Sequence, residues 1–373
     1  MMRLQKHFFD RVFVFGLLFC APSILEAQTS NSSNGLYNKA IAASRDAVRA
    51  MMKSVKVPGV SVAVAMKGEI VWREGFGFAD LDKKVSATTE TKFGIGSITK
   101  SFTAVLFARL MEEGKVDLDT PVENYLPQFP HKNKNITARL IIGHLSGLND
   151  EFNGTHYYET RYFSTGAALD EILRENKLRS PPRTRHEYTT SNYTIIAAII
   201  EKVSGQDFSS ALNQYVINPR GLKNTLLNDR RLNIEHCTSF YVQNEKGVVK
   251  APDYDPSFKW AGAGLFSTAS DVATYGTALL QSKFLRPNTR DEIFRALKTS
   301  SGEDTGYGLG WYIAEDAKGR RMYHHGGGGL GISSYLCLYP QEDFVLAILS
   351  NLTGAPVNDE VATKIVEAFL AVK

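Results

Sequence analysis

Apolar runs near each end of the chain predict two antiparallel hairpins. Residues 60–65 and 70–72 flank Lys67-Gly68, a pattern typical of a strand, a tight turn and a second strand. Residues 334–339 and 344–349 repeat this arrangement around a polar turn. Each pattern therefore predicts a pair of antiparallel strands.

Helical periodicity at both ends extends this picture. Apolar residues at helical spacing predict an amphipathic helix over 37–52 and a closing helix over 361–369. The simplest assembly joins both ends of the chain into one sheet covered by helices and leaves the mostly helical middle as a second lobe. We therefore predict an α/β (α+β) fold, with an α/β lobe of residues 36–114 and 262–373 and a helical lobe of 115–261. A small-molecule site is expected in the cleft between the two lobes.

The first 27 residues differ in composition from the rest. Basic residues precede an uncharged run over 12–25, and the small Ala27 follows, which is typical of a secretory signal peptide. The run is shorter than the about 20 residues that a membrane-spanning helix needs. We predict an exported protein, periplasmic or extracellular, with no membrane span once residues 1–27 are removed. A mitochondrial transit peptide is the alternative, disfavoured because Asp10 and Glu26 flank a continuous apolar core.

Composition excludes some classes of protein. The 43 basic and 39 acidic residues give a net charge of +4 without a basic block, so no nucleic-acid partner is predicted. Outside the predicted signal peptide the cysteines are Cys237 and Cys337, which can pair only in an oxidising compartment. Cys337 lies in an apolar alternating stretch typical of a small buried residue. No CxxC or HExxH spacing is present, so no metal site or cofactor is predicted. The oligomeric state is not indicated.

The string Ser97-Ile98-Thr99-Lys100 is the central chemical signal, and it is the only SxxK string in the chain. Gly96 precedes it, apolar residues follow at helical spacing as far as Leu110, and Gly114 suits a helix C-terminus. Ser97 is therefore expected at the start of a buried helix, with Lys100 one turn on and facing the same side. A serine hydroxyl needs a neighbouring base, and a lysine with a lowered pKa can be that base. In the alternative interpretation, Ser97 is an ordinary helix cap and Lys100 is a solvated lysine.

Two further segments carry candidate chemistry. The polar-aromatic segment 188–193 precedes an apolar helical run and is interpreted as an active-site loop. The segment 324–331 contains a match to GxGxxG, but a phosphate-binding loop requires a helix afterwards, and 332–339 is predicted as a strand. A glycine run beside a strand instead lets a ligand approach the backbone closely.

These motifs occur in the order SxxK, tyrosine loop and Lys/His-x-Gly strand, which resembles the serine β-lactamase and penicillin-binding-protein family. Segments 143–148, 218–222 and 261–268 are similar to that family too, and 121–130 and 259–262 resemble its mitochondrial members. The resemblance covers nearly everything after the predicted signal peptide. It implies a β-lactamase/transpeptidase-like fold, an antiparallel sheet flanked by helices plus an all-helical lobe, with the active site between them.

The resemblance also implies roles for individual residues. Ser97 would attack a carbonyl and form an acyl-enzyme, and Lys100 would take its proton. Tyr188 would pass a proton to the leaving group or from water. The backbone N–H groups of Ser97 and Gly328 would form the oxyanion hole, with Gly327 beside them.

Two positions depart from the family's pattern. The tyrosine motif of the family usually ends in Asn, whereas Thr190 holds that register and Asn192 follows two positions later. The strand motif of true β-lactamases is Lys-Thr-Gly, whereas this chain has His325-Gly326-Gly327. A histidine titrates near 6.5 if unperturbed, so His325 is a weaker partner than lysine for a substrate carboxylate at neutral pH.

We therefore predict a serine hydrolase that cleaves an ester or amide bond of a small-molecule or peptide substrate. Two alternatives remain open, a true β-lactamase or D-Ala-D-Ala carboxypeptidase, and a catalytically silent binding protein of the same fold. An α/β-hydrolase is disfavoured because the chain contains no GxSxG string.

Overall fold

The computed structural model describes residues 35–130, 134–149, 162–175, 177–281, 284–358 and 360–372, so the predicted signal peptide lies outside the described residues. The helices are α1 (Asn38–Val55), α2 (Thr99–Glu112), α3 (Ala138–Ile142), α4 (Thr165–Glu175), α5 (Asn192–Ser204), α6 (Phe208–Leu212), α7 (Trp260–Ala263), α8 (Ala269–Leu280), α9 (Pro287–Ile293) and α10 (Glu360–Leu370), with a short 3-10 turn, η1 (Gly96–Ile98), before α2. The strands are β1 (Gly59–Met66), β2 (Glu69–Asp80), β3 (Val85–Ser86), β4 (Phe93–Gly94), β5 (Leu226–Leu227), β6 (Tyr241–Asn244), β7 (Gly247–Lys250), β8 (Leu265–Ser267), β9 (Tyr312–Glu315), β10 (Arg321–Gly329), β11 (Ile332–Tyr339) and β12 (Phe344–Ser350).

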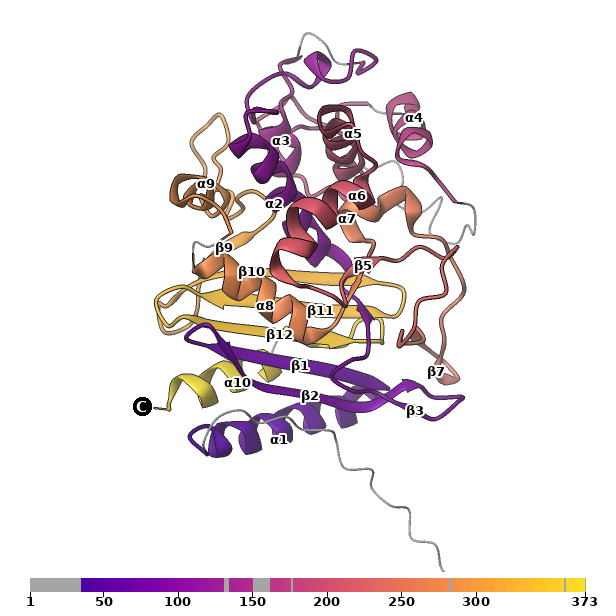
Figure 1. Cartoon of the computed structure of the whole chain (residues 1–373), viewed down its shortest axis with the longest axis vertical. Helices are drawn as coiled ribbons and strands as arrows, with labels where there is room; N and C mark the ends of the chain where they lie inside the picture. Colours follow the sequence, from indigo (N-terminus) through magenta and orange to yellow (C-terminus); the bar gives the residue numbers. More distant parts are fainter. Residues whose placement is uncertain are drawn as a thin grey trace, which may run out of the picture.

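The main sheet joins the two ends of the chain. Within the described residues it has seven antiparallel strands in the order β3-β2-β1-β12-β11-β10-β9 (Figure 1). Both predicted hairpins are confirmed, and Lys67 and Gly68 have the positive φ angles that a two-residue hairpin turn needs. β1 pairs with β12, with Val60 opposite Ser350, so the first and last hairpins form one continuous sheet as predicted.

Helices cover both faces of this sheet. The terminal helices α1 and α10 lie together on one face, where Val48, Val361 and Phe369 belong to a shared apolar core (Figure 1). On the other face α8 packs against β1, β11 and β12. All residues of these three strands are buried because both faces are covered, which explains why they are apolar at nearly every position.

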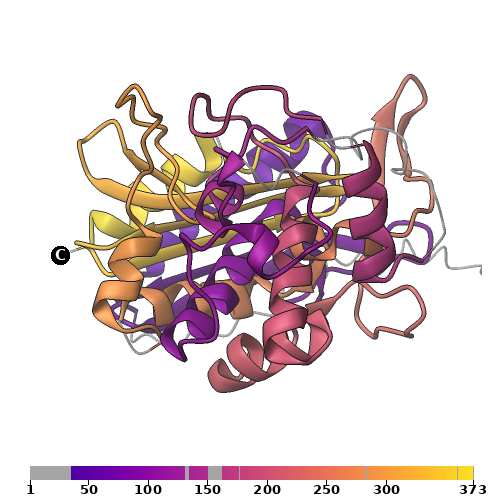
Figure 2. The same ribbon diagram turned by 90° about the horizontal axis from the view of Figure 1, so that it is seen from above.

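The middle of the chain forms the helical half of the molecule, which lies over the sheet in Figure 2. Helix α2 packs against α5, α7 and α9 in this half, although the sequence assigned residues 36–114 to the α/β lobe. The range 115–261 also contains the short strands β5, β6 and β7, whereas the family resemblance implies an all-helical lobe. The lobe boundaries themselves stay predictions.

The structure also bears on membrane-spanning helices and on the two cysteines. In the described part of the chain, no helix is both long and apolar enough to cross a membrane. Cys237 and Cys337 are not bonded to each other. Cys337 is fully buried on β11, and burial raises the pKa of its thiol to about 12. The thiol therefore stays uncharged, and Cys337 packs like a small apolar residue.

Candidate active site

Ser97 lies on η1, where the main sheet meets the helical half. Its side chain is partly exposed, whereas the helix α2 that follows is buried along most of its length. Gly96 has a φ of +49°, and a Cβ there would lie 2.8 Å from the backbone N of Gly328 on β10. Glycine is therefore required at this position, and the serine turn lies directly against β10.

Lys100 lies one turn along α2 and is fully buried, which excludes the interpretation as a solvated lysine. Its Nζ is 3.0 Å from the Oγ of Ser97. The same Nζ donates to Thr190 Oγ1 at 3.1 Å and to the carbonyl oxygen of Gly262 at 2.9 Å. Lys100 therefore connects the serine turn with two segments from the middle of the chain, and Thr190, in the register of the family's Asn, contacts it directly.

Tyr188 is brought to the same place. Its ring centroid is 4.8 Å from Lys100 Nζ, and its side chain is 37% exposed, so it can also reach a bound molecule. The ring packs against His144 at 4.3 Å, and Tyr307 and Tyr312 lie within 6.5 Å. An aromatic wall thus surrounds the predicted tyrosine.

His325 lies on β10 but is fully buried. Its Nδ1 is 2.6 Å from the carbonyl oxygen of Gly326, which can only accept, so Nδ1 donates and Nε2 accepts from the Tyr307 hydroxyl at 3.0 Å. Burial and then the nearby charge of Lys100 lower the pKa of His325 to about 3. His325 is therefore not the unperturbed histidine with a pKa near 6.5, because a buried imidazolium would lose its hydration. His325 is neutral near pH 7, and both of its ring nitrogens are already hydrogen-bonded.

At Gly327 there is no room for a side chain between β10 and the serine turn. A Cβ at Gly327 would overlap the carbonyl oxygen of Ile95 and the hydroxyl of Ser334. That hydroxyl donates to Ile95 O at 2.8 Å and so ties β11 to the turn. A Cβ at Gly328 would meet no atom within 4 Å, so this position faces open space. The glycine run permits the close backbone approach that the sequence predicts.

Sequence reasoning missed His144. It is fully buried with a φ of +58°, and its Nδ1 accepts the backbone N–H of Thr189 at 3.1 Å. Burial, followed by the charge of Lys100, holds the pKa of His144 well below its usual value. His144 thereby fixes the loop that carries Tyr188. Segment 143–148 resembles the family, but nothing in that string indicates this contact.

The fold and the site together define the class of protein as a serine hydrolase with the β-lactamase fold. Residues 45–370 match the family described as Beta-lactamase, so the chain belongs to this family. The resemblance inferred from the sequence is thus confirmed.

Three relatives show how this chain fits in the family. It is 27% identical over 407 residues to the serine beta-lactamase-like protein LACTB, mitochondrial, of Mus musculus, covering 82% of this chain and 74% of that protein. It is 26% identical to penicillin-binding protein 4* of Bacillus subtilis, covering 78% of this chain and 67% of that protein. Among solved structures, a D-stereospecific amidohydrolase from Streptomyces sp. is 26% identical with a TM-score of 0.73, covering 89% of this chain and 99% of that one.

Proposed function

We propose that this protein hydrolyses an ester or amide (peptide-like) bond through an acyl-enzyme on Ser97. The observation that carries this proposal is the 3.0 Å distance between Ser97 Oγ and the Nζ of Lys100, an amine that is fully buried. A hydroxyl becomes a useful nucleophile when a base within hydrogen-bond distance can take its proton.

The surroundings of Lys100 suit a base. Once Lys100 has lost a proton, its amine has two N–H donors and one lone pair. The carbonyl of Gly262 accepts one N–H, the hydroxyl of Thr190 accepts the other, and the lone pair then faces Ser97.

The reaction follows from these positions. As Ser97 Oγ attacks the substrate carbonyl, its proton moves to Lys100, and the carbonyl oxygen becomes an oxyanion held by the N–H groups of Ser97 and Gly328. When the bond to the leaving group breaks, Tyr188 passes a proton from Lys100 to the departing alcohol or amine. Water then attacks the acyl ester, gives its proton back along the same path, and releases the acid and free Ser97.

The site favours substrates without a carboxylate beside the scissile bond. His325 occupies the place of the lysine in β-lactamases, but it is neutral and its ring is hydrogen-bonded to Tyr307 and Gly326. We propose that His325 holds β10 and Tyr307 in place, so that Gly327 and Gly328 present backbone to the substrate. Ester and amide substrates therefore rank above β-lactams, in line with the similarity to the Streptomyces amidohydrolase.

Export is proposed from the sequence of residues 1–27 alone. The curated relatives include mitochondrial proteins and a bacterial penicillin-binding protein, so both compartments occur among them. Expression of the full chain followed by N-terminal sequencing of the secreted fraction tests this proposal. A mature N-terminus close to residue 28 supports it, and retention of residues 1–27 in the cell overturns it.

Covalent labelling tests the catalytic assignment. An alkyl fluorophosphonate should add once, and peptide mapping should place the adduct on Ser97. The Ser97→Ala variant should not be labelled, whereas Ser101→Ala is a matched control on the same helix, because its hydroxyl donates to Ile98 O. Labelling that persists in Ser97→Ala, with the fold intact by circular dichroism, would exclude Ser97 as the nucleophile.

A comparison of substrates tests the preferred class. On one preparation, kcat/KM for an activated ester should exceed that for a cephalosporin. A cephalosporin value of about 10⁶ M⁻¹s⁻¹ or more, the range of efficient enzymes, would reverse our ranking.

A further inference from the structure

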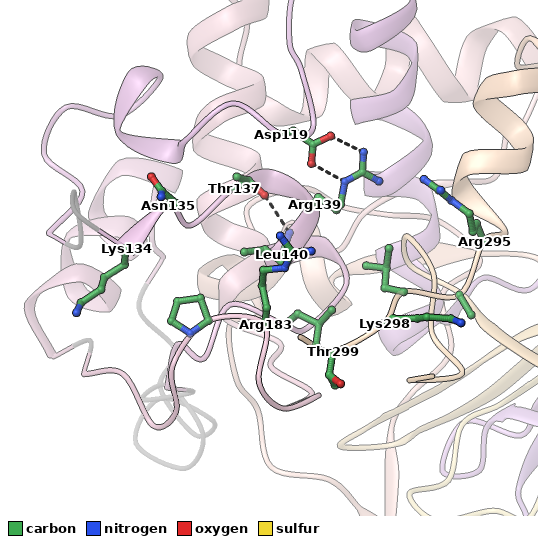
Figure 3. Close-up of a pocket in the computed structure, with 14 residues that line it drawn as sticks. Asp119, Lys134, Asn135, Thr137, Arg139, Leu140, Arg183, Arg295, Lys298 and Thr299 are labelled. Atoms are coloured by element: carbon green, nitrogen blue, oxygen red, sulfur yellow. Dashed lines mark hydrogen bonds and ion pairs between the residues drawn. The ribbon is translucent and has the colours of Figure 1, made fainter. Parts of the chain in front are cut away.

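A cavity of about 960 Å³ opens on the helical half of the molecule, at a place that the proposed reaction does not use. Its walls come from the chain around α3, from Pro182 and Arg183, and from residues 295–299 after α9 (Figure 3). None of the proposed catalytic residues lines it. The volume is in the range of small-molecule sites, about 300–1,000 Å³.

The charges on the walls of this cavity are strongly unequal. Among the described lining residues, Asp119 is the one acidic residue, whereas the basic ones are Lys134, Arg139, Arg183, Arg295 and Lys298. Asp119 holds Arg139 through two hydrogen bonds, and Glu292 just outside pairs with Arg139 and Arg295. Within the described residues, Lys134, Arg183 and Lys298 form no ion pair.

The basic residues of the cavity also lower the pKa of Asp119. Hydrogen bonds from Arg139, against the opposing effect of burial, lower the pKa of Asp119, and the charges of Arg183 and Arg295 lower it further. Among the described residues, three cationic side chains thus share this cavity without forming an ion pair, and the carboxylate of Asp119 is already hydrogen-bonded to Arg139. Such a concentration of charge attracts anions, because arginine and lysine are the usual partners of phosphate and carboxylate groups.

The backbone of Arg183 is held in an unfavourable conformation that keeps its side chain at this cavity. Its φ is +70°, which is uncommon for a residue with a side chain. Its N–H donates to Leu145 O at 2.7 Å, and its carbonyl accepts the N–H of Ser300 at 2.7 Å. These two hydrogen bonds tie Arg183 to the segment after α3 and to the segment after α9, and its side chain lines the cavity. Conformations of this kind persist where the surrounding structure enforces them, often at binding sites.

We propose that this cavity binds a small organic phosphate ester. A doubly charged phosphate matches the three unpaired cations better than a single carboxylate, which would leave most of the positive charge unmatched. The arginine fork of Arg183 and the ammonium of Lys298 would hold the phosphate oxygens. Leu140, Leu145 and Leu297 supply an apolar surface for the organic part.

Phenyl phosphate is a suitable probe because it joins one phosphate to one apolar ring. Binding is measured by isothermal titration calorimetry on the Ser97→Ala protein, so that the proposed catalytic reaction cannot contribute. We expect Arg183→Gln and Lys298→Gln each to weaken binding by about tenfold or more, as loss of a charge-assisted hydrogen bond does. Arg183→Gln adds no new backbone strain, because glutamine is an L-residue like arginine and takes the same φ. Circular dichroism checks that both variants are folded. Arg49→Gln, which removes one positive charge from the exposed face of α1, should bind as tightly as the parent.

Two further measurements distinguish binding in this cavity from binding at the serine site and from general attraction of anions. Wild-type protein fully labelled at Ser97 by a fluorophosphonate should still bind phenyl phosphate, and benzoate should bind more weakly. The proposal is overturned if neither Arg183→Gln nor Lys298→Gln weakens binding, if Arg49→Gln weakens it equally, or if labelling abolishes it. Equal affinity for benzoate and phenyl phosphate would overturn the assignment to phosphate esters. The comparisons of the variants and of the two probes do not depend on whether Ser97 is the nucleophile; only the labelling experiment does.

Discussion

Replacing Gly327 with alanine tests whether β10 must lie in contact with the serine turn. The added Cβ would overlap Ile95 O and the hydroxyl of Ser334, the two atoms that join the turn to the sheet. Ordinary contact between a Cβ and a neighbouring heavy atom begins at about 3.4 Å. The strand β10 and the serine turn would therefore have to separate by more than about 1 Å. Overpacking of this kind costs about 1–3 kcal/mol of stability. A misplacement of about 1 Å in an active site costs about 100-fold in rate, or about 2.7 kcal/mol of barrier.

We therefore expect Gly327→Ala to remain folded but to lose about 100-fold in kcat/KM for an activated ester. The neighbouring Gly326→Ala is the matched control, because its Cβ would meet only Ser334 O, at an ordinary distance of 3.8 Å. It should retain activity within about threefold, well under the tenfold that corresponds to about 1.4 kcal/mol. Hydrolysis of a nitrophenyl ester and the rate of fluorophosphonate labelling measure both variants, and thermal unfolding reports their stability. If Gly327→Ala is as active as Gly326→Ala, the contact between β10 and the turn does not matter for catalysis.

Three other predictions concern charge at the site. Lys100→Met should lose acylation while keeping its circular dichroism spectrum, because Ser97 then has no base; acylation within about tenfold of wild type would mean that Lys100 is not the base. Because burial lowers the pKa of His325 to about 3, KM for a carboxylate-bearing ester should stay constant between about pH 5.5 and 7.5, and a rise through about pH 6.5 would contradict this. The lowered pKa of His325 also predicts how the free energy of unfolding depends on pH. This free energy is greatest above about pH 6.5, where the histidine is neutral in both the folded and the unfolded chain. It falls as the pH drops toward 5, because only the unfolded chain then binds a proton at this histidine, by up to about 1.4 kcal/mol per pH unit. Urea unfolding should show a shallower pH dependence for His325→Gln, and equal slopes for the two proteins would refute the prediction.

The sequence by itself determined the two hairpins of the sheet and the position of the nucleophile candidate. Apolar runs and short polar turns are local features of the chain, so hairpins over 60–72 and 334–349 could be predicted from local patterns. Their pairing into one sheet followed from simple assembly rules. The SxxK spacing, too, is a property of one helical turn, which is why Ser97 and Lys100 were found together.

Only the tertiary structure decided what surrounds these residues. Lys100 meets Thr190 and Gly262, which are 90 and 162 residues away along the chain, and no local pattern encodes such contacts. The partner of His325 is the hydroxyl of Tyr307, and burial there moves the pKa of the histidine far from its value in solution. Hydrogen bonding and hydration depend on which distant segments pack together, so the charge state of His325 could be learned only from the folded chain.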